Sequence, residues 1–423
     1  GVGPLPWPAA NTILCQIVPP TFPTKTCTVT DAVYGAKADG TTDDTDAFKK
    51  AIADCSQAGG GHVIVPSGSY VSGAIELLDN IDLQFQMGAV IKFSGDVTKY
   101  PIVLTRYEGI ELMNHSPMIY AYKRTNIGIT GPGVLDASGT GSWNTGSSRA
   151  PLEVYANSNT PVSMRAAGGC CRSTFVEPYS CTNVLIKGIT LRGAHFWQIH
   201  PTLSTNVTVD GVHVTDSGLS NDDGFDPESS DHVLLTNSTI ESSDDAMAIK
   251  SGRDADGRRI NVPTSSFVFM HSSFASKVGL LTLGSEATGG IHDVYGYDIK
   301  TTAAGVTYVL QIKGNTQRGG VVTNVHLDTV VSSNVRSKVV NADMHYMGQT
   351  GPYMPMYGNF SLSNATIGGA PQVLNLVGLS AATPLGPVVM SNSTYTNIGN
   401  AMNVAQNATV TWNNVTINGA PAH

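Results

Sequence analysis

The 423-residue chain is short of charge, of long apolar runs and of paired metal-binding cysteines. Charged residues make up only 13%, and no long basic run accompanies the net charge of -8, so nucleic acid is not an expected partner. No apolar run approaches the roughly 18 residues of a membrane span, so no membrane partner is expected either. No two cysteines have CxxC spacing, so neither a metal nor another cofactor is expected.

The number of cysteines and the glycosylation sequons indicate the cellular location of the protein. The chain has an even number of cysteines and many Asn-x-Ser/Thr sequons, which together predict a secreted, glycosylated, disulfide-bonded protein. The alternative is a cytosolic protein with six free thiols. The first residue is Gly1, which indicates a processed N-terminus. The sequons begin at Asn206, Asn237, Asn359, Asn364, Asn392, Asn407 and Asn414, and the cysteines are Cys15, Cys27, Cys55, Cys170, Cys171 and Cys181.

A short pattern of asparagine, apolar, any and apolar residue recurs along the chain. The interval from Asn183 to Asn206 is 23 residues, and the next, to the looser copy at His232, is 26. Short strands at such a period, without helices between them, predict a solenoid. The asparagines are interpreted as ladder or turn residues. Further copies begin at Asn80, Asn126, Asn324 and Asn359, with a looser one at Ser266.

One amphipathic segment, Asp43 to Gly59, has helical character, with Ala47, Phe48, Ala51 and Ile52 on one face. We therefore predict an all-β, single-domain, right-handed parallel β-helix whose first coil is capped by this helix. A cap is needed because the end of a solenoid exposes apolar core and strand edges. Residues 27–423 are assigned to the β-helix, and the proline-rich residues 1–26 to an extended arm without a fold of its own.

Aspartates gather in two stretches, SNDDGFDPESS from Ser220 and SSDDAMAIKSGRDADGRR from Ser242. Asp223 and Asp244 are 21 residues apart, close to one repeat, so Asp223, Asp244 and Asp245 are expected to converge on neighbouring coils. Crowded carboxylates repel one another, and one of them should hold its proton to higher pH. Glycoside hydrolysis needs this combination of a protonated acid and an ionised base. The alternatives are solvated turns or, less favoured, a calcium loop.

Several motifs resemble those of the polygalacturonases, glycoside hydrolase family 28, and are nearest the exo-acting branch. They are NDDGFDPES, SSDDAMAIKSGRDADGRR, LTLGSE, TRYEGIELMNHSPMIYAY and FWQIHP, and the resemblance covers about residues 28–334. It implies a right-handed parallel β-helix and inverting hydrolysis of pectin. It also implies that Asp244 is the general acid, that Asp223 and Asp245 activate water, and that Asn221 shapes the sugar-binding subsite.

Two positions depart from the family pattern. Val278 stands where the family usually has a histidine, and Gln311-Ile312-Lys313 stands where it has Arg-Ile-Lys. Lys313 and Gln311 are therefore expected to contact substrate without the bidentate clamp that an arginine provides. Rhamnogalacturonan hydrolases are similar in lacking both residues, so the substrate is expected to be galacturonan or rhamnogalacturonan. Arg258 is a further candidate for binding uronate.

The loop with Tyr107 and Glu108 is expected to wall off one end of the site, which predicts exo action. The expected partner is a pectic polysaccharide or oligosaccharide, acted on by a monomer. The resemblance also implies a Cys27–Cys55 disulfide, and one bridge is expected within Cys170, Cys171 and Cys181, with Cys15 as the remaining partner. An inactive or carbohydrate-binding solenoid, and a calcium-dependent pectate lyase, remain as alternatives.

Overall fold

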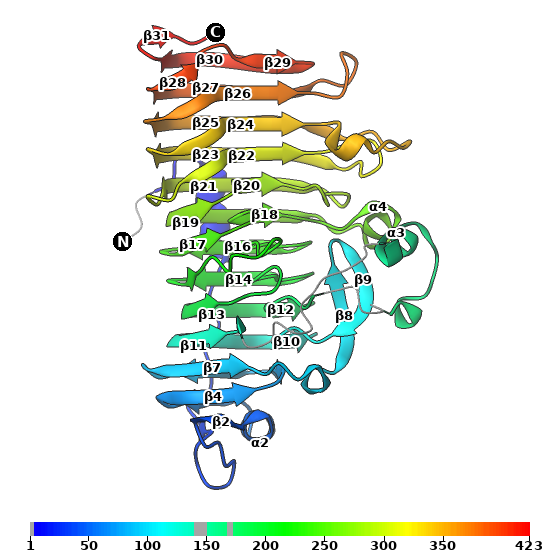
Figure 1. Ribbon diagram of the computed structural model, residues 1–423, viewed down its shortest axis with the longest axis vertical. Coiled ribbons are helices and arrows are strands. Elements are labelled where there is room, and N and C mark those ends of the chain that lie inside the picture. Colours follow the sequence, from blue (N-terminus) through cyan, green and yellow to red (C-terminus); the bar gives the residue numbers. More distant parts are fainter. Residues whose placement is uncertain (1–3, 139–149, 167–171) are drawn as a thin grey trace.

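The chain winds into a stack of coils of short parallel strands (Figure 1). The computed structural model describes residues 4–138, 150–166 and 172–423. The prediction of a parallel β-helix is confirmed. The N-terminal coils lie at one end of the stack and the C-terminal coils at the other, so residues one coil apart in the sequence lie on adjacent strands.

One long sheet carries the asparagine repeats. Its strands pair in parallel, coil after coil, with Val184 opposite Val207 and Val207 opposite Val233. The strands are β3 (Gly61–Val65), β6 (Ile81–Phe85), β11 (Thr125–Asp136), β13 (Thr182–Arg192), β14 (Thr205–Asp210), β16 (Asp231–Thr236), β19 (Thr264–Ser276), β21 (Ile291–Thr301), β23 (Val321–Ser332), β25 (Met356–Ile367), β27 (Leu385–Tyr395) and β30 (Ala408–Ile417). Shorter strands extend the same sheet: β1 (Thr26–Thr28), β2 (Asp39–Asp43), β4 (Gly68–Ser72), β7 (Ala89–Phe93), β15 (His213–Val214), β17 (Thr239–Ser242) and β31 (Ala420–Pro421).

A second row of strands forms the face that carries the aspartates. In its early coils the strands are β5 (Ile75–Glu76), β10 (Ile119–Tyr122) and β12 (Val176–Tyr179). In its later coils they are β18 (Met247–Ile249), β20 (Gly279–Leu283), β22 (Val306–Lys313), β24 (Val335–Asp343), β26 (Ala370–Val377), β28 (Ile398–Asn400) and β29 (Val404–Gln406). Between the two groups, isolated bridges link Val176 to Ile199, Ile199 to Phe225 and Phe225 to Met247.

The repeated asparagines form a ladder, as predicted. Asn126 donates its side-chain amide to Asn80 (2.9 Å), Asn183 to Asn126 (2.9 Å) and Asn206 to Asn183 (2.7 Å). Each of these residues has a positive φ, between 57° and 62°, a conformation that asparagine tolerates better than most residues. The looser copies at His232 and Ser266 share this conformation.

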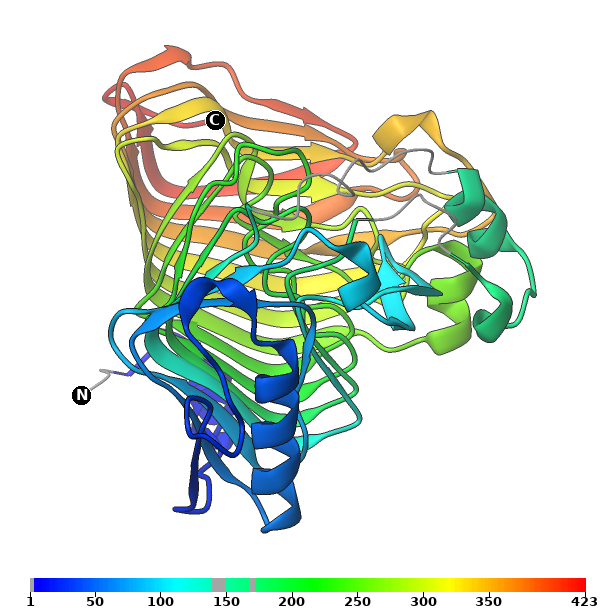
Figure 2. The same cartoon turned by 60° about the horizontal axis from the view of Figure 1, so that its bottom comes forward.

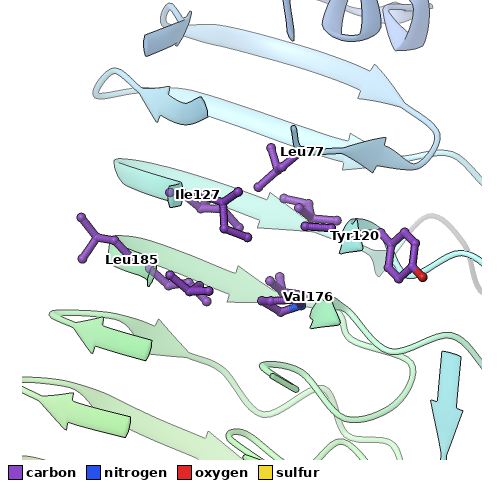
Figure 3. Close-up of a pocket in the computed structure, with 12 residues that line it drawn as sticks. Leu77, Tyr120, Ile127, Val176 and Leu185 are labelled. Carbon is purple, nitrogen blue, oxygen red and sulfur yellow. The ribbon is translucent and has the colours of Figure 1, made fainter. Parts of the chain in front are cut away.

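The interior is filled by apolar side chains stacked from coil to coil. One buried column contains one apolar residue from each of several successive strands, which are bridged or paired to one another. An alternating apolar pattern at each repeat is therefore sufficient to build the core. Figure 3 shows Leu77, Ile127 and Val176 in a small apolar cavity in the early coils. The column contains Ile119, Val176, Ile199, Phe225, Met247, Leu281, Leu310, Val340 and Leu374.

The predicted capping helix is present as α2 (Thr45–Gln57), at the N-terminal end of the stack (Figures 1 and 2). Its buried face consists of Ala47, Phe48, Ala51, Ile52 and Cys55, which pack against the first coils. The helix therefore covers core that would otherwise meet water.

The prediction that the N-terminal arm is extended and has no fold is wrong for part of it. Residues Pro8–Gln16 form a helix, α1, with proline at its first turn, where the missing N–H costs nothing. Ala10 and Ile13 pack with Val268 and Met270 of β19, in a cluster separate from the main core. Trp7 lies 5.2 Å from the ring of Tyr295, so the arm is fastened to the outside of the β-helix.

The structure does not contain the predicted Cys27–Cys55 disulfide. Both residues are buried free thiols, and Cys15 and Cys181 are also free. Burial and the neighbouring Cys27 raise the pKa of Cys55 to about 12, as expected for a thiol in apolar surroundings. Cys170 and Cys171 lie outside the described residues. Within the described part of the chain, no helix is long and apolar enough to cross a membrane.

Candidate active site

Asp223, Asp244 and Asp245 meet on the face that contains β18. Each offers a carboxylate oxygen within 4.8 Å of the others. The coil register places Asp223 beside Asp245, because Phe225 pairs with Met247 and each aspartate precedes its partner strand residue by two positions. The predicted convergence is therefore present, although the stacked pair is Asp223 with Asp245, one residue away from the expected one.

Asp244 is oriented by hydrogen bonds from the main chain. Its carboxylate accepts from the N–H groups of Asn221 (3.1 Å) and Asp245 (2.8 Å). Its own N–H donates to Asp222 (2.8 Å), a buried carboxylate that also accepts from the N–H of Ser243 (2.9 Å). Asp244 is half-buried, so its carboxyl group is fixed in direction and still accessible.

Asn221 reaches the site through its main chain. Its N–H holds Asp244, while its side-chain oxygen accepts from Arg172 (2.8 Å). Arg172 also donates to the carbonyl groups of His195 and Ser220, so it fixes the turn before Asp222. Sequence reasoning missed Arg172, since no local motif surrounds it.

Asp245 is buried beside the next coil. Its carboxylate accepts from the Gly279 N–H (3.0 Å) and the Thr282 hydroxyl (2.6 Å). A Cβ at position 279 would lie 2.9 Å from the Asp245 carboxylate, so glycine leaves room for this contact. Burial raises the pKa of Asp245, although the charge of Lys313 opposes the effect.

Asp226, which was not among the predicted site residues, completes the acidic group. It is fully buried, and its carboxylate accepts from the N–H of Ala248 (3.1 Å). Burial and the charges of Asp226 and Asp244 raise the pKa of Asp223 well above its usual value. Burial also raises the pKa of Asp226, to about 7. The crowded group of carboxylates therefore keeps a proton to higher pH than an isolated carboxyl would.

Basic groups lie beneath this acidic cluster. The Lys250 amine donates to Glu286 (2.6 Å) and lies 4.9 Å from the centre of the Trp197 ring. Burial lowers the pKa of Lys250, but Glu286 and Asp226 raise it more strongly, so it keeps its charge. This buried cation is close enough to the aspartates to lower the pKa of Asp226.

His200 is buried between Glu177 (2.9 Å) and Glu228 (2.8 Å). Burial lowers its pKa, but the two carboxylates raise it to about 9, so it is an imidazolium at neutral pH. Its side chain is 0% exposed, so it supports the site from below and does not touch a sugar. Glu228 also lies 3.6 Å from Arg106, which continues this row of buried charges.

The coils that follow the aspartates present polar side chains along the same face. Thr282 pairs with Gln311, and Gln311 with Asn341. Gln311 and Lys313 are half-buried, whereas Leu310 and Ile312, which alternate with them along β22, point into the core. Burial lowers the pKa of Lys313, but Asp245, Tyr346 and Asp244 together raise it above its usual value, so the lysine is charged beside the aspartates.

Two other residues singled out in the sequence lie differently. Arg258, on α4 (Asp254–Ile260), stacks on Tyr353 at 3.4 Å and donates to the carbonyl groups of Gln317 and Arg318. These contacts hold it in the wall of the molecule, and its role in binding uronate stays a prediction. Val278 is half-buried at the start of β20, two residues from Ser276.

A hairpin, β8 (Ile102–Tyr107) and β9 (Ile110–His115), stands over the coils that precede Asp223 (Figures 1 and 2). Tyr107 stacks on Phe196 at 4.3 Å, and Phe196 stacks on Trp197 at 5.0 Å. Trp197 precedes Ile199, the bridge partner of Phe225, by two residues, so it lies one coil before Asp223. Tyr107 and Glu108 are themselves buried in this packing.

Ion pairs fasten the hairpin to α4, and apolar packing against Leu152 and Ala156 joins it to α3 (Ala150–Asn157). Asp256 of α4 accepts from Arg165 (2.9 Å) and from the N–H of Glu111 (2.8 Å), and Arg259 pairs with Glu111 (2.8 Å). The hairpin, α3 and α4 thus pack together beside the coils that precede Asp223.

A model of the family described as "Glycosyl hydrolases family 28" matches residues 55–368. A "Probable polygalacturonase" from Vitis vinifera is 27% identical over 308 residues, which cover 70% of this chain and 58% of the relative. An "Exo-poly-alpha-D-galacturonosidase" from Dickeya chrysanthemi is 24% identical over 371 residues, 79% of this chain and 61% of the relative. The chain thus spans about 60% of the length of these curated relatives.

Among solved structures, a hyperthermoactive exopolygalacturonase from Thermotoga maritima superimposes with a TM-score of 0.91. It is 33% identical, and the match covers 98% of this chain and 96% of the other. The similarity therefore extends over the whole described β-helix, including the coils beyond the matched family region.

Proposed function

The chain belongs to family 28 of the glycosyl hydrolases, and on that premise we propose that it hydrolyses pectic polysaccharide as an exo-acting enzyme. The observation that carries the proposal is the group of three carboxylates within 4.8 Å of one another, and the β8–β9 hairpin beside the preceding coils supports the exo mode. The group supplies both a proton donor and a base, as glycosidic cleavage requires.

In the proposed reaction, Asp244 protonates the leaving glycosidic oxygen, while Asp223 and Asp245 hold and activate a water molecule. Main-chain hydrogen bonds fix Asp244, and the Thr282 hydroxyl fixes Asp245, so little reorganisation is needed when substrate arrives. The carboxylates are closer than the separation of about 6.5–9.5 Å usual for inverting enzymes. The expectation of inversion therefore rests on the family and not on this spacing.

The exo mode is supported by the hairpin. Its ion pairs, Glu111 with Arg259 of α4 and Glu108 with Arg253 just before α4, are buried or partly buried, so it resists displacement by a polymer. A chain lying along the polar face meets this block just beyond Asp223, at Trp197 and Tyr107. Only a chain end then fits between the hairpin and the aspartates.

The proposed substrate is a galacturonan, because Lys313 keeps a positive charge beside Asp245 and attracts a uronate carboxylate. The loss of arginine at position 311 weakens this preference and leaves rhamnogalacturonan as the second candidate. An extracellular location belongs to the proposal because pectin is an extracellular polymer. Detection of the protein in culture medium of its source would support that location, and its confinement to the cells would oppose it.

Product analysis tests the proposal. The protein is incubated separately with polygalacturonan and rhamnogalacturonan, and released sugars are separated over time. Exo action gives monomers or dimers from the first time points with little loss of viscosity, whereas random cleavage lowers viscosity early. A chelator arm and ultraviolet absorbance distinguish a calcium-dependent lyase, and absence of any product from both polymers would refute the proposal.

A further inference from the structure

Three cations lie on the coils that follow the aspartates. Lys313 is on β22, and Arg336 and Lys338 are on β24. Their partners in the structure are neutral: Lys313 lies 5.1 Å from the centre of the Tyr346 ring, and Lys338 donates to the Ser337 hydroxyl at 3.2 Å. Lys313 also interacts with the charge of Asp245, whereas Arg336 and Lys338 form no ion pair within the described chain, so their charges remain available to an anion.

Arg336 is directed by an irregularity in strand pairing. Val306 pairs with Val335, and Tyr308 pairs with Lys338, so Thr307 alone faces both Arg336 and Ser337. Such a bulge inserts one residue into a strand and redirects side chains, and bulges are common beside active sites. Here the redirected side chain runs back along the stack toward the aspartates.

The guanidinium of Arg336 is anchored across two coils. Its Nε donates to the Thr307 hydroxyl (3.3 Å), one Nη to the Ala304 carbonyl (2.6 Å) and the other Nη to the Ser276 carbonyl. A guanidinium has five N–H donors, so two remain after these three contacts. The side chain is exposed, and the two donors are therefore free to meet a ligand.

Ser276 connects this guanidinium to the acid. Its hydroxyl donates to the main-chain carbonyl of Asp244 (2.5 Å) and accepts from the N–H of Val278 (2.8 Å). Arg336 thus reaches the turn that carries Val278, the position at which a family histidine is replaced. Lys277, on the same turn, turns instead toward Asp216, at 3.9 Å.

We propose, on the basis of the proposed function, that Arg336 binds the carboxylate of the uronic acid unit next to the cleaved bond, on the side of the later coils. It supplies the fork of N–H donors that Gln311 cannot supply, from a strand one coil further along. A carboxylate accepts two parallel N–H bonds from a guanidinium, and the three neutral anchors hold that fork in place before substrate arrives. The residue selects an acidic sugar over a neutral one at this position.

Kinetics on tetragalacturonate test the assignment with Arg336→Gln, Arg336→Lys and a control, Lys300→Gln. Lys300 is an exposed cation on β21, so its loss matches the change in net charge. We expect Arg336→Gln to lower kcat/KM by about tenfold to hundredfold, mainly through KM, because a charged hydrogen-bonded pair is lost. Arg336→Lys should recover only part of this, and Lys300→Gln should match the parent. Arg336→Gln within twofold of the parent would overturn the assignment, as would full recovery in Arg336→Lys.

A binding arm separates failure of this inference from failure of the proposed function. Calorimetry measures trigalacturonate binding to Asp244→Asn and to Asp244→Asn/Arg336→Gln, with melting temperatures confirming that both proteins are folded. Weaker binding by the double variant supports the role of Arg336 even if the parent proves inactive. Equal binding by the two variants overturns the role of Arg336, and an active parent then still upholds the proposed function. If Asp244→Asn does not bind and the parent is inactive, both proposals are refuted.

Discussion

Replacing Asp226 with asparagine should stabilise the protein at neutral pH and leave it unchanged in acid. The side chain is fully buried, and burial raises its pKa from 3.8 to about 7. In the unfolded chain the carboxyl loses its proton near pH 4, while in the folded protein it keeps the proton until about pH 7. Wild-type stability therefore falls as pH rises through this interval, and above it the full penalty remains.

The size of the expected stabilisation follows from the change in the pKa of Asp226. The folded-state pKa is about three above the value in the unfolded chain, and each pKa unit is worth 1.36 kcal/mol, so the penalty is about 4 kcal/mol. Asparagine has nearly the same shape and no charge, so Asp226→Asn escapes the penalty. With an unfolding entropy of about 2.1 cal/mol/K per residue, 4 kcal/mol is about 4–5 °C in a chain of this length.

Melting temperatures of wild type and Asp226→Asn, measured from pH 3.5 to 8, are the assay. The curves should coincide below about pH 4 and separate by about 4–5 °C at pH 7, the variant being higher. Asp46→Asn, on the exposed face of α2, is the control for loss of a surface carboxylate. A variant that melts below wild type at pH 7 would show that the ionised carboxylate is stabilised by Lys250, and the reasoning would be refuted.

Three further outcomes are expected. Asp244→Asn should lower turnover by about 10²–10⁴-fold while trigalacturonate binding persists, since an amide cannot donate the proton; reducing-sugar release and calorimetry measure the two effects, and full activity would contradict the mechanism. Asn183→Ala should lower the unfolding free energy by about 2–4 kcal/mol, because two ladder hydrogen bonds and a residue suited to positive φ are lost. Denaturant titration measures the change, and a loss below about 0.5 kcal/mol would contradict the ladder's role. Asn206 should carry no glycan when the chain is expressed in a glycosylating host, because its amide nitrogen donates to both Asn183 and the Val18 carbonyl. Peptide mass analysis measures this, and a glycan on Asn206 in folded protein would contradict the hydrogen-bond assignment.

The repeat predicted the fold because each coil obeys the same local rules. An asparagine with positive φ starts each strand and the alternation that follows fills the interior, so the ladder can be predicted without knowledge of distant contacts. The same repeat also places asparagines that lie in sequons. Asn206, Asn359 and Asn414 are ladder residues whose amide nitrogens donate to another asparagine one coil away. These three sequons therefore coincide with the ladder, and secretion and glycosylation stay predictions.

The site was predictable where chemistry and spacing coincide and not elsewhere. The three aspartates converge, but the pairing of Asp223 with Asp245 depends on a coil of 22 residues, and coil length varies along this chain. In the sequence, Asp226 resembles a turn residue. Its burial could not be predicted, because it depends on the coils before and after it. Arg336 is further still from prediction, since its direction depends on a bulge at one position of β24.

The buried charges are concentrated in one part of the stack. Within the described residues, the buried acidic and basic side chains of the later chain end at Arg318, apart from Asp328. Burying a charge costs stability unless it is paired, so coils rich in Glu228, Lys250 and Glu286 depend on their neighbours for order. The later coils, with apolar interiors and neutral ladders, supply that order. A solenoid adds stability nearly coil by coil, so the coils that carry the aspartates can be individually less stable while the whole stack stays folded.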